Sequence, residues 1–487
     1  MRMENRLSGR FKMEPFGGER ILIGHFRVGR TDGVSLQISA WKEILTKAGA
    51  KVALVSGSYN CGADFEIPHL ENQLDSEVYR VDEGAFDRAD AFADEKSFKE
   101  AFGRISKAVE NGVRKAVAEF SPTRMIISNI FSVGENIAAA EGILKVLDEV
   151  SVPTLLINHD LYWENRRYDH PLFSFVQTYL AENFPPKRSY ISHACINSLR
   201  QGGLVRRKGV HVDLLPDSLD FNRVLQDKNA QCAKLLRQFG IQPEDIMVLQ
   251  ATRVVRRKNI ELAVDFVREL SKSSRVQMIK KRGLYSGRGF DPARNKIVLV
   301  IAGYAERRDQ WYLQKVIDYA KKQGVYFVHL DGAFNGYPNG HWQRKPGLLD
   351  LHIYADLVTY LSSAEGFGNQ FLEAVLSKTP VVVFEYSVFQ ADIKPKGFEV
   401  ISLGREMGIN PETGLSLCPE VVLKRAASQA VDLLTDPRSY RLMVEKNFEI
   451  GRENFSFENT LERFIKIMKP GYVERARRWM RNVEVDV

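Results

Sequence analysis

Residues 357–386, "LVTYLSSAEGFGNQFLEAVLSKTPVVVFEY", decide the fold class of this chain. Their first apolar run predicts a strand, a turn with two glycines follows it, and the apolar spacing after Gly368 predicts a helix. A second apolar run, residues 380–386, begins almost at once after that helix. A strand, a helix and a strand in this order form a β–α–β unit, which indicates a sheet of parallel strands covered by helices.

The same alternation of apolar strands and amphipathic helices extends outward over most of the chain. Expected strands of the first half lie at residues 20–26, 51–57, 124–130 and 154–160. A second series begins near residue 216, with expected strands at 246–252, 296–303, 325–333, 357–363 and 380–386. The pattern predicts an α/β protein with two doubly wound, Rossmann-like domains. A proline-bearing segment, residues 212–224, separates them.

Composition argues against several classes of protein. The longest uncharged apolar runs are strand-sized, far below the ~20 residues that span a bilayer, so we expect no transmembrane segment. Four cysteines lie far apart without a C-x-x-C pair, which argues against a zinc site and favours the cytoplasm. The formal net charge of +8 suits anionic small molecules. Because no zinc-finger or RNA-recognition pattern accompanies that charge, we expect no nucleic-acid partner.

Polar residues follow two strands of the first series, at the edge where doubly wound sheets bind ligands. After the first strand, a turn with Gly29 and Gly33 opens a helix, and glycine there lets backbone N–H groups approach an anion. After residues 154–157 comes a polar set of the kind that binds sugars, namely Asn158, His159, Asp160, Arg166 and Arg167. The histidine can donate to a hydroxyl, and the arginines can grip a phosphate or carboxylate. Purely structural roles are equally open for these residues.

Charged residues follow two strands of the second series. Arg253 and Lys258 flank a short basic loop after residues 246–252. Two cations five residues apart suit a diphosphate, because hydrogen bonds to charged groups contribute ~1.5–3 kcal/mol each. A solvated basic loop has the same composition. Glu365 precedes the helix that begins near Gly368.

A second carboxylate, that of Glu373, lies inside the helix that Glu365 precedes. A helical rise of about 1.5 Å per residue puts the two carboxylates on the order of 10 Å apart. That is about the span from the sugar ring to the ribose of a nucleotide sugar. The helix N-terminus between them, with the N–H groups of Gly368 and Asn369, suits the diphosphate.

Three blocks of sequence resemble a known family, the retaining GT-B glycosyltransferases of family 4. "AEGFGNQFLEAVLSKTPVVV" (364–383) resembles the E-x7-E signature of that family, and "RVVRRKNIELAV" (253–264) resembles its Arg…Lys loop. "HVDLLPDSLDF" (211–221) stands where the family has a segment like "PNGVD". Departures include Thr252 in place of a glycine and a first glycine turn without a Gly-Gly pair.

The resemblance implies a GT-B fold with three segments. Residues 1–215 would form an acceptor-binding domain, residues 216–455 a nucleotide-sugar-binding domain, and residues 456–487 C-terminal helices that cross back to the first domain. The implied catalytic residues are Glu365, His159, Arg253 and Lys258. The implied donor-binding residues are Gly33, Arg253, Lys258, Gly366, Phe367, Gly368, Asn369 and Glu373. The predicted acceptor-binding residues are Asn158, Asp160, Arg166 and Arg167.

The predicted function is transfer of a hexose, with retention, from GDP-mannose or UDP-glucose to a small anionic sugar-type acceptor. The chain has no D-x-D motif, so we expect no metal and no cofactor besides the nucleotide sugar. One alternative is a lipid- or polysaccharide-pathway transferase, for which the basic stretch 471–483 would give weak peripheral membrane contact. Others are a GT-B nucleotide-sugar epimerase and a non-catalytic sugar-nucleotide-binding protein. The sequence leaves the oligomeric state open.

Overall fold

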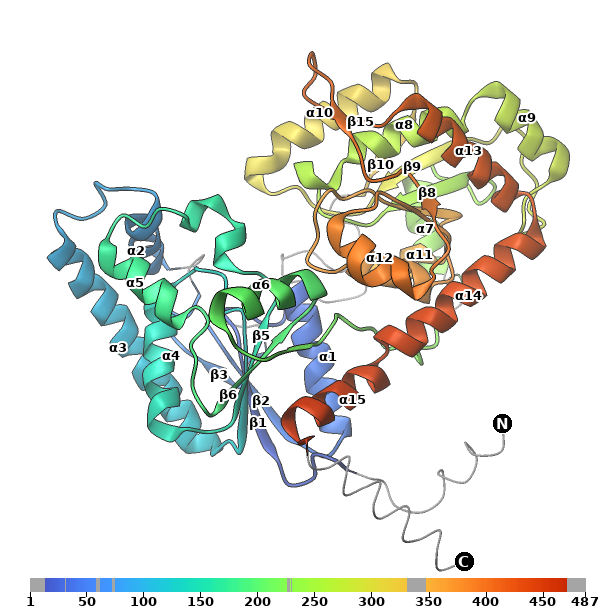
Figure 1. Ribbon diagram of the computed structural model, residues 1–487. Coiled ribbons are helices and arrows are strands. Elements are labelled where there is room, and N and C mark those ends of the chain that lie inside the picture. Colours follow the sequence, from blue (N-terminus) through green and yellow to red (C-terminus); the bar gives the residue numbers. More distant parts are fainter. Residues whose placement is uncertain are drawn as a thin grey trace, which may run out of the picture. The chain divides into compact units, whose positions relative to one another are not determined.

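The computed structural model of the protein describes residues 14–30, 32–57, 62–71, 75–225, 228, 230–330 and 347–470. The chain divides into two compact units (Figure 1). The first unit contains residues 1–216 and 457–487, and the second contains residues 217–456. Each unit is built on its own parallel sheet.

The first unit has a seven-stranded sheet in the order β3-β2-β1-β4-β5-β6-β7, in which every neighbouring pair is parallel. Its strands are β1 (Arg20–Gly24), β2 (Lys51–Ser56), β3 (Phe65–Glu66), β4 (Arg124–Ser128), β5 (Thr154–Asn158), β6 (Ile191–Cys195) and β7 (Val212–Leu214). All five residues of β5 are buried, as expected for a parallel strand covered on both faces. The order of strands reverses between β1 and β4, which is the switch point where doubly wound sheets bind ligands.

Helices connect these strands, with α3 and α4 on one side of the sheet and α1 and α15 on the other (Figure 1). The helices are α1 (Gly33–Lys47), α2 (Ser76–Phe86), α3 (Glu95–Phe120), α4 (Ile137–Val150), α5 (Ser174–Asn183), α6 (Ser198–Lys208) and α15 (Phe457–Met468). Their starts are set by local sequence: Asp32 caps α1, and Asp94 caps α3 in a capping box with Ser97. The core between helices and sheet is aliphatic and aromatic.

The last described helix, α15, returns to the first unit. It packs on α1, where the rings of Trp41 and Phe464 meet edge to face with centroids 6.3 Å apart. Arg463 donates to the backbone carbonyl of Leu214 at 3.0 Å, and Lys469 pairs with Glu19 at 2.8 Å. The predicted return of a C-terminal helix to the first domain is confirmed.

The second unit has a six-stranded parallel sheet in the order β10-β9-β8-β11-β12-β13. Its strands are β8 (Ile246–Gln250), β9 (Ile297–Ile301), β10 (Tyr326–His329), β11 (Leu357–Tyr360), β12 (Val381–Val383) and β13 (Ile401–Ser402). A small antiparallel pair, β14 (Gly408–Ile409) and β15 (Ser416–Leu417), lies outside that sheet. The order again reverses, here between β8 and β11, so the second unit has its own switch point.

The helices of the second unit are α7 (Ala230–Gln238), α8 (Ile260–Leu270), α9 (Ser273–Arg282), α10 (Gln310–Lys322), α11 (Leu348–His352), α12 (Asn369–Leu376), α13 (Glu420–Leu434) and α14 (Pro437–Phe455). Among them α8 is almost wholly buried, and it packs against α13 and α10 in the core of this unit. The predicted fold class, two Rossmann-like parallel sheets with a returning helix, is confirmed.

Two predicted segments differ from the structure. Residues 212–224 were expected to separate the domains, but their first three residues form β7, because they pair with β6 at the edge of the first sheet. The strand expected at residues 325–333 ends at His329, and residues 331–346 lie outside the described residues. The basic stretch 471–483 also lies outside them.

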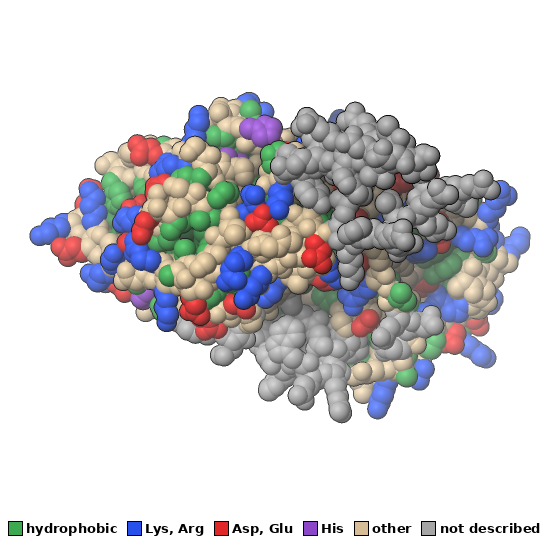
Figure 2. All heavy atoms as spheres, turned by 90° about the horizontal axis from the view of Figure 1, so that it is seen from below, with side chains coloured by type: hydrophobic (Ala, Val, Ile, Leu, Met, Phe, Trp, Pro, Cys, Tyr) green, Lys and Arg blue, Asp and Glu red, His purple; other side chains and the backbone are tan. Residues whose placement is uncertain are grey.

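The surface mixes charges of both signs. On the face seen in Figure 2, lysine and arginine side chains are interspersed with aspartate and glutamate and do not form one continuous basic field. None of the described helices is both long and apolar enough to cross a bilayer.

Candidate functional site

The loops after β8 and β11 are neighbours because these two strands pair in parallel at the switch point of the second sheet. The loop after β8 contains a short 3-10 helix, Arg256–Lys258, and leads into α8. The loop after β11 contains Glu365 and leads into α12. The predicted cations and the predicted carboxylate therefore lie on adjacent loops.

Lys258 and Glu365 form a buried ion pair between these loops. Their side chains are only 5% and 10% exposed, and the Lys258 ammonium contacts Oε1 of Glu365. Arg257, which the sequence interpretation did not single out, contacts the same oxygen through Nη1 at 2.8 Å. One carboxylate oxygen thus contacts two cations, which gives the site a compact centre of charge.

Burial and pairing act on these groups in opposite directions. Burial disfavours the ionised carboxylate of Glu365, but Lys258 and Arg257 outweigh it and hold its pKa below the ordinary value. Burial lowers the pKa of Lys258, and the charge of Glu365 opposes that shift. The Lys258 ammonium also lies 5.3 Å from the centre of the Tyr360 ring. The site therefore holds charge that a bound anion can engage.

Hydrogen bonds to backbone carbonyls fix the two loops to each other. Ser363 N–H donates to the carbonyl of Arg257 at 2.8 Å, and the Arg257 guanidinium donates to the carbonyl of Ala364 at 2.8 Å. Asn259, in the left-handed conformation with φ 47°, donates to the carbonyl of Leu361 at 2.8 Å. These bonds position Glu365 relative to the cations. The sequence signal for this left-handed residue was an asparagine directly before an amphipathic helix, because asparagine adopts this conformation more readily than most residues.

Arg253 lies farther out on the same loop. Its guanidinium pairs with Glu306 at 3.1 Å, and both side chains are about a third exposed (39% and 33%). The loops after β8 and β9 approach closely here, because a Cβ atom at Gly303 would lie 1.8 Å from the carbonyl oxygen of Thr252. Only glycine fits at residue 303 without moving the backbone that carries Arg253.

The Gly-Phe-Gly turn begins α12, as predicted. Phe367 is buried against the ring of Phe455, with centroids 5.2 Å apart, and its carbonyl accepts a hydrogen bond from the Tyr386 hydroxyl. A Cβ atom at Gly368 would lie 2.7 Å from that hydroxyl oxygen, so Gly368 also fills a position with no room for a side chain. Gly366 is the first residue of this turn, and Asn369 is the first residue of α12.

Glu373 lies in α12 with its carboxylate 18% exposed and 3.7 Å from Nε2 of His352. Burial raises the pKa of Glu373 to about 7, although Lys258 acts against the shift. His352 is fully buried, and burial lowers its pKa to about 4, so its ring is neutral at pH 7. A carboxyl group poised near neutrality is suited to accept hydroxyl hydrogen bonds when it ionises.

In the first unit, Asn158 and His159 lie at the end of β5 and are buried. Asn158 donates to the carbonyl of Ala194 on β6 at 2.9 Å, so its amide joins two strands. His159 packs on Trp41 with ring centroids 5.7 Å apart. Burial, with help from the charge of Arg200, lowers its pKa to about 3. The imidazole is neutral at pH 7, and the predicted sugar contacts of both residues stay predictions.

Asn129, at the end of β4, positions the loop after β5. It adopts a left-handed conformation with φ 58°, and its Oδ1 accepts from the backbone N–H groups of His159 at 2.8 Å and Asp160 at 3.2 Å. The sequence interpretation treated Asn129 as part of a strand. An asparagine directly after an apolar run was the signal for this strand end.

The predicted acceptor residues of this loop differ in what they contact. Asp160 pairs with Arg200 at 3.0 Å, an arginine that the sequence interpretation missed. Arg167 pairs with Asp82 at 2.7 Å and with Asp87 at 2.6 Å, so its guanidinium is held by two carboxylates within its own unit. Arg166 is exposed. An anion can therefore reach Arg166 from solvent, while Arg167 keeps its ion pairs with Asp82 and Asp87.

Gly33 is the first residue of α1 in the first unit. The preceding Asp32 caps the helix: its carboxylate accepts from Ser35 N at 3.2 Å and from the Ser35 hydroxyl at 2.9 Å. Arg27 lies 3.6 Å from the same carboxylate. Burial disfavours the charge of Asp32, but Arg27 and Ser35 hold its pKa below the ordinary value. The described residues contain no cluster of three metal-ligating side chains.

Known proteins match the chain over nearly its whole length. It is 33% identical to the mannosylglucosylglycerate synthase of Petrotoga mobilis over 433 residues, which covers 88% of this chain and 97% of that protein. It is 32% identical to the mannosylglucosylglycerate synthase of Thermotoga maritima, over 90% of this chain and 97% of that protein. The chain belongs to the mannosylglucosylglycerate synthase family. No protein-family model matches it.

Solved structures of lower identity show the same fold as this member of the mannosylglucosylglycerate synthase family. The Anabaena HepE protein, crystallised with UDP and glucose, matches 93% of this chain and 100% of that chain with a TM-score of 0.56 and 13% identity. A sucrose-phosphate synthase from Thermosynechococcus elongatus matches 94% and 98% with a TM-score of 0.55 and 14% identity. The fold is GT-B, and the protein is a glycosyltransferase.

Proposed function

We propose that the protein transfers a mannosyl unit, with retention, from GDP-mannose to a hydroxyl of a glucosylglycerate-type acceptor. The observation that carries the proposal is the buried Lys258–Glu365 ion pair, with the partly exposed Arg257 on the same carboxylate, at the switch point of the second sheet. It provides cations for a diphosphate and a carboxylate for sugar hydroxyls. The name of the relatives, mannosylglucosylglycerate synthase, combines mannosyl, glucosyl and glycerate and supports this choice of substrates.

In the proposed site, charge on the second unit stabilises the departing diphosphate. Lys258 and Arg253 pair with the phosphate oxygens, and the N–H groups of Gly368 and Asn369 add the field of the α12 N-terminus. Gly366 and Phe367 shape the turn that lets the donor approach this backbone. Glu365 binds hydroxyls of the transferred sugar, while Glu373 binds the ribose. The charges and turns that this arrangement needs are present in the described residues.

The proposed reaction replaces one bond at the anomeric carbon. The bond from this carbon to the diphosphate oxygen breaks with its electron pair on the oxygen. The acceptor hydroxyl oxygen bonds to the same face of the carbon, and its proton passes to the leaving diphosphate. Retention follows from attack on the face that the diphosphate leaves. The neutral imidazole of His159 can donate a hydrogen bond to the transferred sugar, and the proposal assigns no step to a metal ion.

The acceptor side of the proposal rests on the first unit. The exposed Arg166 pairs with the carboxylate of the glycerate moiety, and Asp160 accepts from acceptor hydroxyls. Gly33 presents the start of α1 to the donor phosphate. Asn158 and Arg167 keep their contacts within the unit and support this surface. We further propose that the protein acts in the cytoplasm, without a nucleic-acid partner.

The direct test is product analysis with purified protein, GDP-mannose and glucosylglycerate. We expect one mannosyl addition by mass spectrometry, an α-anomeric product by NMR, unchanged turnover in excess EDTA, and no product with UDP-glucose. An inverted product would refute retention, and transfer only to other acceptors would refute the substrate assignment. Conversion of the donor without an acceptor would favour the epimerase alternative. Acceptor activity only with lipid-linked sugars, together with co-sedimentation with anionic liposomes, would favour the membrane alternative.

A further inference from the structure

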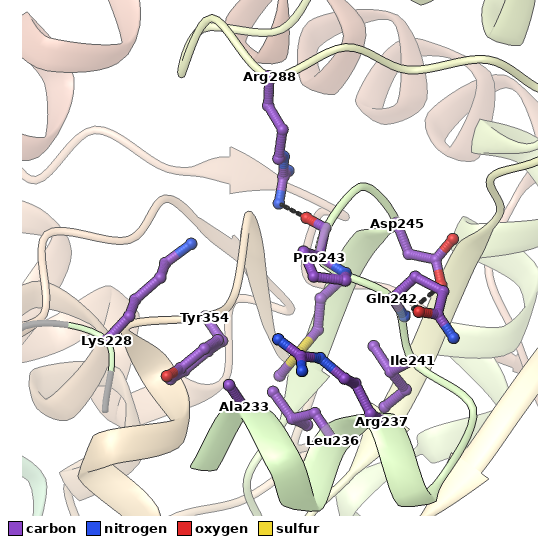
Figure 3. A pocket seen from close by; sticks show the side chains of 11 residues that line it. Lys228, Ala233, Leu236, Arg237, Ile241, Gln242, Pro243, Asp245, Arg288 and Tyr354 are labelled. Carbon is purple, nitrogen blue, oxygen red and sulfur yellow. Dashed lines mark hydrogen bonds between the residues drawn. The ribbon is translucent and has the colours of Figure 1, made fainter. Parts of the chain in front are cut away.

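A pocket lies at the edge of the second sheet opposite to the candidate donor site (Figure 3). It has a volume of about 190 Å³ and is lined by residues of α7, the following turn and the start of β8. The donor-side cations follow the other end of β8, after Gln250. The pocket and the donor site therefore lie at opposite ends of one strand, and the proposed transfer reaction does not use the pocket.

The pocket has an apolar floor. Leu236, Ile241 and Met247 line it together with Tyr354, whose ring lies near Ala233 in Figure 3. Leu236, Ile241 and Met247 are almost completely buried. Apolar side chains at the bottom of an open pocket favour a ligand with an aliphatic or aromatic body, because its burial removes apolar surface from water.

Cations stand around this floor. Lys228, Arg237 and Arg288 line the pocket and extend from three separate segments toward it (Figure 3). Among the described residues, neither Lys228 nor Arg237 takes part in an ion pair, and the ammonium of Lys228 lies 5.3 Å from the ring centre of Tyr354. These two side chains therefore have charge to offer a ligand.

The other two charged side chains at the pocket, Arg288 and Asp245, already have hydrogen-bond partners within the protein. Arg288 donates to Asp356 at 2.6 Å and to the carbonyl of Pro243 at 2.9 Å, while its buried Nε has no hydrogen-bond partner among the described residues. The carboxylate of Asp245 accepts from backbone N–H groups of Gln242 and Lys296, each at 2.9 Å. The charge at the pocket that remains unmatched is positive.

We propose that this pocket is a binding site for a small amphipathic anion. The acid group of the ligand pairs with Lys228 and Arg237 at the rim. Its apolar body lies on Leu236, Met247 and the ring of Tyr354. A carboxylate on a short arylalkyl or alkyl chain has the size and chemistry that the pocket accepts.

The test measures binding of 3-(4-fluorophenyl)propionate to the full chain by fluorine NMR. GDP is kept saturating, so that the donor site is closed to the probe. The neutral amide of the same probe reports how much of the affinity comes from the acid group. The charge variant Lys228→Gln/Arg237→Gln is compared with Lys234→Gln/Lys281→Gln, which removes the same charge from exposed residues of α7 and α9 outside the pocket lining.

We expect saturable binding of the carboxylate, with an affinity about tenfold lower in the Lys228/Arg237 variant and unchanged in the Lys234/Lys281 variant. The neutral amide should bind wild-type protein about as weakly as the carboxylate binds the Lys228/Arg237 variant. Ala233→Phe, which fills the pocket, should abolish binding while GDP affinity and the melting temperature stay at wild-type values. No saturable binding to wild-type protein, or equal loss in both charge variants, would overturn the proposal.

Discussion

The two units place charged side chains at the same edge of similar sheets, yet they use them differently. In the second unit, Lys258, Arg257 and Glu365 come from loops after two paired strands and form one charged cluster, in which Lys258 and Glu365 are buried. In the first unit, the buried groups after β1 and β5 are the neutral rings of His25 and His159. Two of its arginines, Arg167 and Arg200, pair with carboxylates of their own unit. A site for a diphosphate needs fixed cations, whereas a site for a neutral sugar needs hydrogen-bonding groups without charge.

The largest expected effect comes from breaking the charged cluster with Lys258→Ala. We expect kcat/KM for transfer to fall ~10³-fold, because a cation that stabilises the departing diphosphate is lost. We also expect the free energy of unfolding to fall by about 3 kcal/mol, since the buried carboxylate of Glu365 keeps only Arg257. Steady-state kinetics and urea unfolding measure the two effects. Lys281→Ala, on the exposed end of α9, is the control, and activity within tenfold of wild type in Lys258→Ala would contradict the assignment.

The second effect tests how the cluster is positioned. Gly303→Ala puts a methyl group where the Thr252 carbonyl oxygen lies, so the backbone before Arg253 must shift. Because misplacement by about 1 Å can cost about 10²-fold in rate, we expect a loss of that order in kcat/KM with the circular dichroism spectrum retained. Gly289→Ala is the matched control, since nothing lies within 4 Å of its added Cβ. Wild-type kinetics in Gly303→Ala would show that the loop holding Arg253 does not need this position.

A third prediction uses pH to separate the two units. Glu373 has a pKa of about 7, so GDP affinity should rise with pH through neutrality as the carboxylate ionises to accept ribose hydroxyls. Below that pKa the change approaches tenfold per pH unit. In the first unit, His25 and His159, with pKa values of about 4 and 3, stay neutral over this range. Calorimetric titration of GDP at several pH values measures the slope, and Glu373→Gln should remove it. A slope that persists in Glu373→Gln would assign the titration to another group.

The same shift has a consequence for stability, and its sign is opposite to that of a salt-bridged carboxylate. The pKa of Glu373 is raised from 4.5 in the folded state, so the unfolded chain releases this proton first. The contribution of Glu373 to the free energy of unfolding is present below about pH 4.5 and is lost as pH rises through about 7. The free energy of unfolding of Glu373→Gln, measured relative to wild type, should therefore be higher at pH 8 than at pH 5.

The smallest expected effects distinguish two neighbouring arginines of the first unit. Arg166→Ala should raise the KM for the acceptor about tenfold without changing stability, because this side chain is exposed and the proposal pairs it with the carboxylate of the acceptor. Arg167→Ala should leave the acceptor KM unchanged and lower the free energy of unfolding by about 2 kcal/mol, since Asp82 is only 4% exposed and loses its partner. Initial-rate kinetics and chemical unfolding measure both. The reverse pattern would make Arg167 the substrate ligand.

Much of the fold followed from the sequence because parallel strands buried on both faces are short, continuous apolar runs. The bounds of β5, β8 and β9 were predicted to within two residues, and the turn at Gly368 was predicted as the start of α12. β6 and β7 were not predicted. Ser192 and His193 interrupt the apolar run of β6, and β7 has only three residues at the edge of the sheet.

Lys258 and Glu365 could be singled out from the sequence, because each is a charged residue in a loop that follows a predicted strand. The sequence could not show which charged side chains of different loops form ion pairs. Arg257 was one of several cations in its run, and only the fold brings it to the carboxylate that Lys258 also contacts. Arg167 was predicted to bind an anion, yet its two carboxylate partners come from residues 82 and 87, more than 75 positions away in sequence. Long-range pairing of this kind leaves no local pattern.

The central claim is that the charged cluster of the second unit binds the diphosphate of the donor. Calorimetric titration of GDP into wild type, Lys258→Ala and Arg167→Ala tests it most directly, because each variant removes one paired cation from a different unit. The account predicts that GDP affinity falls about a hundredfold in Lys258→Ala and stays at the wild-type value in Arg167→Ala. Unchanged affinity in Lys258→Ala, or an equal loss in both variants, would contradict it.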